Sequence, residues 1–338
     1  MSVLMFRSIT ISSLILAAVG FVSASAQSSW KVEQTFHVGG EGGWDYVTVD
    51  APNHRLFVTR SMHTVAIDTE NGTVLGDVPG QKGSHGVALV PRLNRGFITD
   101  GGNGVIVVFD LKTYAVLGTI QAEKDADGII YDPKLDLVLA ASGDGGVLMT
   151  FHPGIDLKNA KVDTIELGGK PEFLASDGNR VYVNLENKDL VAVVDMKARK
   201  VVADWPVAPG GHPTGLAIDA AGHHLFVGCR NPQKMVVMST TDGKIEAALP
   251  IGAGVDAVRF DRGQAFASCR DGSLTVAGEK SGQWVVEQTV QTVAGARTMG
   301  LDRINNKIYL PTAEMEPATT GRPRPKPGTF MIVEVGRD

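Results

Sequence analysis

Residues 215–228 read GLAIDAAGHHLFVG, in which a short apolar strand ends at Asp219, a turn follows, and a second strand runs from Leu225 to Gly228. The same unit recurs along the chain at the period of about 40 to 45 residues that is typical of propeller blades. No stretch has the period of an amphipathic helix. The sequence therefore predicts an all-β protein, a seven-bladed β-propeller. The seven first strands are Tyr46–Asp50, Gly86–Val90, Gly128–Asp132, Phe173–Ala175, Gly215–Asp219, Ala257–Asp261 and Met299–Asp302.

Two further strands complete each predicted blade. A third strand such as Leu190–Asp195 follows the second, and a hairpin turn such as Asn71-Gly72 or Asp242-Gly243 leads to a fourth strand such as Val74–Val78. Asn-Gly and Asp-Gly pairs readily adopt the positive φ angles that a tight hairpin requires. We therefore expect blades of four antiparallel strands.

The last repeat is incomplete. Its third strand, Phe330–Val335, leaves almost no chain for a fourth strand. The segment Trp30–Val38 precedes the first repeat, and its residues VEQTFHV resemble the VEQTV of the fourth-strand segment Val286–Val290. Because closure leaves fewer exposed strand edges, we expect this N-terminal strand to supply the missing outer strand and close the ring.

Length and composition favour a single turn-rich domain. The chain has 338 residues, of which 43% are hydrophobic and 20% charged, with 40 glycines and 16 prolines. This composition is typical of a globular chain and not of a disordered one. We expect residues 27–338 to form one propeller domain that exists as a monomer. The net charge of −5 disfavours broad nucleic-acid binding without excluding it.

Residues 1–26 have the layout of a secretory signal peptide. Arg7 precedes the apolar run Ile9–Val22, and Ala24-Ser25-Ala26 forms a small-residue cleavage motif before Gln27. The apolar run is short for a membrane span, which needs roughly 20 residues. We therefore expect a periplasmic or secreted protein with no stable membrane insertion after cleavage.

The second strands carry a recognisable signature. They include Phe57-Val-Thr-Arg60, Phe97-Ile-Thr-Asp100 and Tyr182-Val-Asn184. On these residues the chain resembles the YVTN-repeat, or YncE-like, family of seven-bladed propellers, and the resemblance covers residues 30–336. It implies a secreted or periplasmic binding protein, and some members of that family associate with single-stranded DNA. It supplies no catalytic motif.

Polar residues stand just before the seven first strands, at equivalent positions of the repeats. Because these ring positions recur once per blade, we expect them to surround the mouth of the central channel. Arg60, Arg230 and Arg270 follow second strands, and the insertion Ala313–Gly328 with its Arg322-Pro-Arg-Pro-Lys326 run follows the last of them. We expect both groups on the same face. The ring positions are Asp45, His85, Asp127, Glu172, Thr214, Asp256 and Arg297.

These features favour the binding of a small ligand or a macromolecular partner at the channel mouth, without catalysis. One alternative is lactonase-like hydrolysis, in which His85 and either Asp127 or Asp45 form an acid–base pair. A second alternative is single-stranded nucleic-acid binding through the arginines, with Trp44 as a stacking platform. No nucleophile-elbow, zincin or P-loop motif occurs in the sequence.

No cofactor is predicted, and residue spacing assigns no set of metal ligands. Carboxylates around one mouth repel one another, so a divalent cation between them is an open alternative. Cys229 and Cys269 lack the C-x-x-C spacing of a thiol-redox motif or a zinc ribbon. Whether they form a disulfide bond stays open, because an exported protein can hold one.

Export is the first testable prediction. Cleavage after Ala26 should leave a mature chain that begins at Gln27, because the small residues before it fit the signal-peptidase motif. Mass spectrometry of the protein recovered from the cell envelope or the medium measures this terminus. A chain that keeps Met1 in the membrane fraction would contradict the prediction.

Overall fold

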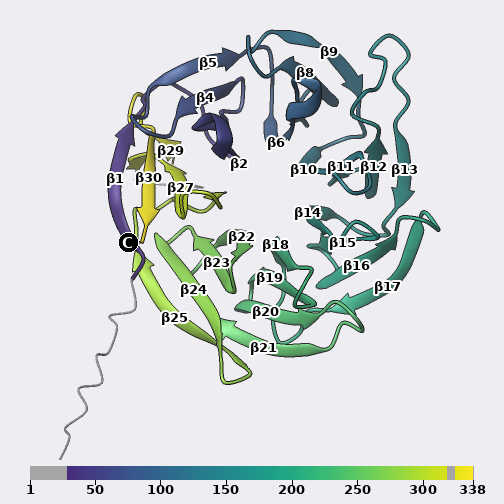
Figure 1. Ribbon diagram of the computed structural model, residues 1–338, viewed down its shortest axis with the longest axis vertical. Coiled ribbons are helices and arrows are strands. Elements are labelled where there is room, and N and C mark those ends of the chain that lie inside the picture. The colour runs from purple at the N-terminus through teal and green to yellow at the C-terminus, as the bar shows by residue number, and fades with distance from the viewer. Residues whose placement is uncertain (1–28, 318–323, 338) are drawn as a thin grey trace, which may run out of the picture.

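The computed structural model describes residues 29–317 and 324–337, so the predicted signal peptide at residues 1–26 lies outside it. Seven sheets of four antiparallel strands stand around a central axis (Figure 1). The described residues contain no helix apart from two short 3₁₀ segments, Ala51–Asn53 and Pro91–Leu93. None of their helices has the length and apolarity needed to cross a membrane. The predicted all-β, seven-bladed propeller is confirmed.

The first six blades are meanders whose strands pair in chain order from the axis outward. Blade 1 contains β2 (Val47–Asp50), β3 (Arg55–Thr59), β4 (Thr64–Asp68) and β5 (Val74–Val78). Blade 2 contains β6 (Ser84–Val90), β7 (Arg95–Asp100), β8 (Val105–Asp110) and β9 (Val116–Gln121). Blade 3 contains β10 (Ala126–Asp132), β11 (Leu137–Ser142), β12 (Val147–Phe151) and β13 (Asp163–Glu166).

Blades 4 to 6 repeat this order. Blade 4 contains β14 (Pro171–Ser176), β15 (Arg180–Leu185), β16 (Leu190–Asp195) and β17 (Lys200–Pro206). Blade 5 contains β18 (Pro213–Asp219), β19 (His224–Arg230), β20 (Gln233–Ser239) and β21 (Ile245–Pro250). Blade 6 contains β22 (Val255–Asp261), β23 (Gln264–Cys269), β24 (Ser273–Lys280) and β25 (Gln283–Gln291).

Blade 7 combines the two ends of the chain. Its inner strands are β26 (Gly300–Asp302), β27 (Lys307–Thr312) and β30 (Met331–Gly336), and β1 (Lys31–His37) pairs antiparallel with β30 as the outermost strand. Figure 1 shows the purple β1 beside the yellow β30. The predicted closure of the ring is confirmed. Between β27 and β30, the strands β28 (Met315–Glu316) and β29 (Arg324–Pro325) form a separate ribbon.

An aromatic side chain on β1 locks blade 7 onto blade 1. Phe36 is buried against the hairpin turn that joins β4 to β5, where a Cβ on Gly72 would collide with its ring. Trp205 on β17 packs in the same way against Gly243 in blade 5. Both glycines have φ near the left-handed region, at +75° and +76°. Only glycine allows both this φ angle and the close contact with an aromatic ring. The outermost strand β1 therefore packs blade 7 against blade 1 in the same way that the outermost strand β17 packs blade 4 against blade 5.

The cysteines lie in neighbouring second strands and are not joined. Cys229 and Cys269 are both buried free thiols, on β19 and β23. Burial raises the pKa of each thiol to about 12. They therefore act as small apolar core residues, since a buried neutral thiol is unreactive.

Ring closure generates the second prediction. Deleting residues 30–37 should expose the edge of β30 and lower the melting temperature or cause aggregation, because an open edge recruits other strands. Phe36→Ala should reproduce part of the loss, about 3–5 kcal/mol for truncating a buried phenylalanine. Val32→Ala on the same strand is the control, since Val32 is 41% exposed. Thermal and denaturant melts measure all three variants, and a truncated chain that melts like the parent would refute the closure role.

Candidate ligand-binding site at the channel mouth

Side chains of neighbouring blades hold the ring positions in place. Buried polar residues in the last two positions of second strands donate hydrogen bonds to the backbone carbonyl of the ring residue in the next blade. Thr298 likewise donates to the carbonyl of Asp45 at 2.7 Å. These bonds fix the backbone of the ring, so its side chains project together at one end of the channel. The second-strand pairs are Thr59 to His85 (2.7 Å), Thr99 to Asp127 (2.6 Å), Asn184 to Thr214 (2.9 Å) and Ser268 to Arg297 (2.6 Å).

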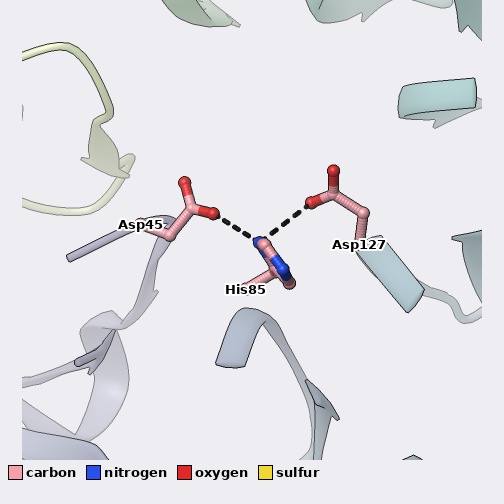
Figure 2. A group of neighbouring side chains, drawn as sticks. All are labelled: Asp45, His85 and Asp127. Atoms are coloured by element: carbon pink, nitrogen blue, oxygen red, sulfur yellow. Dashed lines mark hydrogen bonds and ion pairs between the residues drawn. The ribbon is translucent and has the colours of Figure 1, made fainter. Parts of the chain in front are cut away.

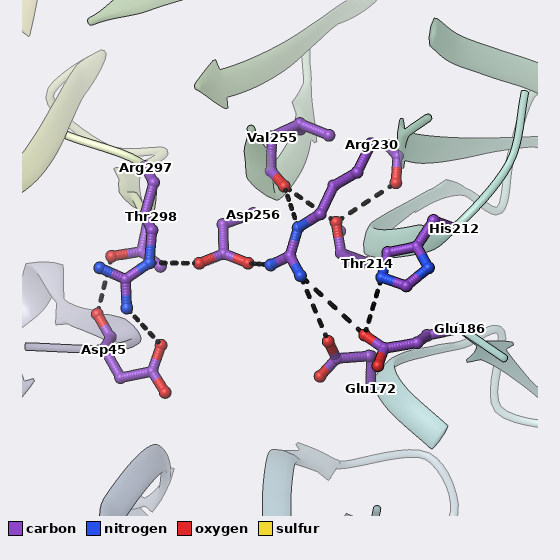
Figure 3. A network of polar contacts seen from close by, with 12 residues as sticks. Asp45, Glu172, Glu186, His212, Thr214, Arg230, Val255, Asp256, Arg297 and Thr298 are labelled. Atoms are coloured by element: carbon purple, nitrogen blue, oxygen red, sulfur yellow. Dashed lines mark hydrogen bonds and ion pairs between the residues drawn. The ribbon is translucent and has the colours of Figure 1, made fainter. Parts of the chain in front are cut away.

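Asp256 bridges two arginines at the mouth (Figure 3). Its Oδ2 accepts a hydrogen bond from Nε of Arg297 at 2.5 Å, and its Oδ1 accepts one from Nη2 of Arg230. Arg297 also donates to the backbone carbonyl of Trp44 at 3.0 Å and lies 3.7 Å from Oδ1 of Asp45. Burial opposes the charge of both arginines, but Asp256 together with neighbouring acids, Glu172 for Arg230 and Asp45 for Arg297, outweighs it and raises the pKa of each. Both guanidinium groups therefore stay charged and are paired with a carboxylate of the ring.

A pair of carboxyl groups on blade 4 holds a proton between them. Burial raises the pKa of Glu172 well above its usual range, and its hydrogen bond with Glu186 and the charge of Asp127 raise it further. The hydrogen bond from Glu172 lowers the pKa of Glu186. Arg230 Nη1 lies 3.8 Å from Glu172 and 3.9 Å from Glu186. The opposite shifts favour the proton on Glu172 and the negative charge on Glu186.

His85 stands between two carboxylates of adjacent blades (Figure 2). Its Nδ1 lies 2.7 Å from Oδ2 of Asp45 and 3.6 Å from Oδ1 of Asp127. Burial opposes protonation of the imidazole, but the hydrogen bond and charge of Asp45 prevail and raise the pKa of His85. Burial, followed by the charge of Asp45, raises the pKa of Asp127 well above its usual range. His85 and Asp127 therefore bind their protons more tightly at the mouth than the same side chains would in the unfolded chain.

The same three residues have the geometry of a cation site. Asp45, His85 and Asp127 each offer one ligand atom, and these atoms lie within 4.8 Å of one another. Carboxylate oxygens suit a divalent cation at about 2.0–2.6 Å, and the imidazole nitrogen of His85 suits a transition-metal ion, so one such ion can reach all three groups. The ion would have to replace the hydrogen bond between His85 and Asp45.

The arrangement fits hydrolysis less well. A general base near pH 7 needs a neutral imidazole, whereas the pKa of His85 is raised. Among the residues that the structure describes, no hydroxyl or thiol forms a hydrogen bond with His85 Nε2. Within residues 29–317 and 324–337, no side-chain nucleophile is therefore hydrogen-bonded to the Asp45–His85 pair.

Arg60 does not reach the mouth. It is 1% exposed, and its guanidinium donates to the backbone carbonyls of residues 39 and 41–43 while stacking over Phe330 at 3.6 Å. Strand register explains the difference. Cys229 pairs with the residue that precedes Thr214, and Arg60 occupies the corresponding place, one residue before the position of Arg230. A shift of one residue turns a strand side chain to the other face.

The register of the second strands also places Glu186 at the mouth, a position that the repeat pattern of the sequence did not reveal. It occupies in blade 4 the place that Arg230 occupies in blade 5, one residue after a buried Leu185. His212 joins the network through Glu186, with Nε2 at 3.7 Å from Oε2. Thr214 is a ring position without a free side chain, because its hydroxyl donates to the carbonyl of Val255 at 3.0 Å and is buried.

The remaining residues of the predicted face have separate roles. Arg270 is exposed after β23. Trp44 is 7% exposed and packs against Phe330, so it presents no stacking face to solvent. In the insertion, Lys326 pairs with Glu314 at 3.0 Å, whereas Arg322 lies outside the described residues. A cavity of about 320 Å³ separates the described part of the insertion from residues 40–43 and Arg60.

Comparisons with known proteins show the fold. No family model matches this chain, and no curated protein matches it either. Hydrazine synthase of Kuenenia stuttgartiensis is similar with a TM-score of 0.70 at 13% identity, covering 86% of this chain and 96% of that one. The Cps50 (Swd1) propeller domain of Myceliophteria thermophila has a TM-score of 0.70 at 13% identity, over 91% and 99%. The WD40 repeats of RRP9 have a TM-score of 0.73 at 10% identity, over 90% and 97%.

The raised pKa values predict how stability depends on pH. A carboxyl group with a raised pKa in the folded state binds its proton more tightly there than in the unfolded chain. Its contribution is favourable below the unfolded pKa and is lost as pH rises toward the folded pKa. Glu172 and Asp127 should therefore lower stability above about pH 4.5. His85 acts in the same direction, because its raised pKa adds stability that disappears as pH rises through that value.

Glu172→Gln tests this dependence, because the amide keeps a neutral donor at the same place. The variant should melt like the parent near pH 4 and about 2 °C or more higher near pH 8, since one pKa unit corresponds to about 1.4 kcal/mol. Glu70→Gln is the control, because the carboxylate of Glu70 is 70% exposed. Identical melting curves for parent and Glu172→Gln across this range would show that Glu172 titrates normally.

Proposed function

We propose that this protein is an exported, monomeric binding protein of the YVTN-repeat type that takes a cationic ligand at the channel mouth and catalyses no reaction. The propeller fold is consistent with a binding or scaffold role, and the second-strand signature supports the YVTN assignment. The observation that carries the proposal is the number of carboxyl groups at the mouth, which exceeds the number of guanidinium groups there. These carboxyl groups belong to Asp45, Asp127, Glu172, Glu186 and Asp256.

The charge balance favours a cation over an anion. Arg230 and Arg297 are already paired with Asp256, so an anion would have to break partly buried ion pairs. A cation would instead replace the protons that Glu172, Asp127 and His85 hold.

Two kinds of ligand share this chemistry. A divalent metal ion would bind Asp45, His85 and Asp127 directly, because their ligand atoms lie within 4.8 Å of one another. An organic ammonium group would donate hydrogen bonds to the same carboxylates. Either ligand must displace protons at neutral pH, so binding should release protons in both cases.

Isothermal titration calorimetry of the mature chain tests the proposal. CaCl₂, MnCl₂ and spermidine are titrated separately near pH 7, in two buffers of different ionisation enthalpy that reveal proton release. We expect at least one of these cations to bind with release of protons. Asp127→Asn with Glu172→Gln should weaken that binding by roughly tenfold or more, the loss expected when a charged hydrogen bond is removed.

Asp136→Asn is the matched control. Asp136 also forms a histidine–carboxylate pair at 2.7 Å, with His152, but this pair lies away from the ring positions. The control should bind like the parent. Failure of all three cations to bind, or equal affinity in the mouth variant, would overturn the proposal. Turnover of lactones that His85→Ala abolishes would favour the hydrolase instead.

A further inference from the structure

The central channel contains a cavity that none of the mouth residues line. It has a volume of about 450 Å³, within the range of roughly 300–1,000 Å³ that small-molecule sites occupy. All seven innermost strands contribute to its wall, mainly with apolar side chains such as Val47, Ile129 and Leu216. The lining includes Arg303, whose side chain is 67% exposed, so the cavity reaches the end of the channel opposite the mouth.

Two aromatic rings separate this cavity from the mouth. Tyr46 on blade 1 and Phe173 on blade 4 have ring centroids 5.0 Å apart. These blades are not neighbours in the ring, so the contact crosses the channel. Both rings belong to the cavity wall, whereas the residues directly before them, Asp45 and Glu172, belong to the mouth.

The charged residues of the cavity wall are both arginines. Arg303 at the rim donates to the carbonyl of Phe260 at 3.2 Å and lies 3.9 Å from Asp261. Arg259 lies deeper, with its guanidinium 5.0 Å from the ring of Phe173. No aspartate or glutamate side chain lines the cavity. The two ends of the channel therefore differ in their charged groups: carboxyl groups paired with arginines stand at the mouth, and arginines without lining acids stand in the cavity.

Arg259 is the unusual member of the wall. Its only hydrogen bond to a described residue runs from Nη1 to the neighbouring carbonyl of Val258, at 2.9 Å, and no described carboxylate forms an ion pair with it. Burial lowers its pKa to about 10. Arg259 is half-buried in the channel, where a charge without an ionic partner costs stability. A ligand carboxylate in the cavity would supply that partner.

We propose that the cavity binds a small organic monocarboxylate, with the carboxylate on Arg259 and the apolar body against the channel wall. A guanidinium fork matches a carboxylate through two parallel hydrogen bonds. Stacking over Phe173 orients that fork, and the apolar lining favours an aromatic or aliphatic body over a hydrophilic anion. The site is separate from the mouth and independent of the ligand proposed there.

Calorimetric titration of the mature chain with phenylacetate tests this site. Phenylacetamide removes the charge, acetate removes the apolar body, and phenethylamine reverses the charge. We expect phenylacetate to bind more tightly than each of the other three. No detectable binding of phenylacetate, or equal binding of phenylacetamide, would overturn the proposal.

Variants locate the site. Arg259→Met should weaken phenylacetate binding by roughly tenfold to a hundredfold, and Arg259→Lys should weaken it less, because the ammonium keeps the charge but not the fork. Arg262→Gln is the control, since Arg262 is a half-exposed arginine outside the cavity wall. Unchanged affinity in both Arg259 variants would place the carboxylate elsewhere.

Stability separates a binding role from a structural one. Without ligand, Arg259→Met should melt at the parent temperature or above it, because methionine removes an unpaired charge from an apolar cavity. A clear loss of stability in both Arg259→Met and Arg259→Lys would instead show that Arg259 serves the fold, and would contradict the proposal.

Discussion

The pairing of β1 with β30 is the interaction on which the rest of this protein depends. It closes blade 7, and closure sets blade 7 against blade 1. Arg297 and Thr298 then meet Trp44 and Asp45 across a sequence separation of 253 residues. Without that contact, the chain of ion pairs through Asp256 would end at an open gap. The mouth is therefore a property of the closed ring and not of any single blade.

Closure also gives the channel two chemically different ends. Carboxyl groups gather at the mouth, and the raised pKa of Tyr46 reflects burial together with their negative charge. Beyond the Tyr46–Phe173 contact, the charged residues of the wall are Arg259 and Arg303. The wall of the cavity is mainly apolar, so a charge bound at one end of the channel also acts on the other end.

Both ends hold groups that lack the usual ionic partner. The pKa of Glu172 is raised by burial and by neighbouring acids, and Arg259 lines an apolar cavity without an acidic partner among the described residues. Arg60 shows the contrast, since it is more deeply buried than Arg259 but satisfied by backbone carbonyls and the ring of Phe330. A charged or polar group that lacks such partners lowers the stability of the fold. We expect ligands to bind where such groups occur.

The sequence alone determined the seven blades, the closing strand and the ring positions, because each rests on a local strand period repeated along the chain. It could predict that His85 lies near Asp45 and Asp127, since adjacent repeats become adjacent blades. It placed Arg60 at the mouth because loose alignment hid a shift of one residue, which reverses the face of a strand. The tertiary structure alone decided which charges find partners. In the sequence, Arg259 is one polar residue of a strand with alternating polar and apolar side chains. Its lack of an acidic partner among the described residues becomes visible only in the folded ring, where blades 1, 4 and 6 meet around the channel.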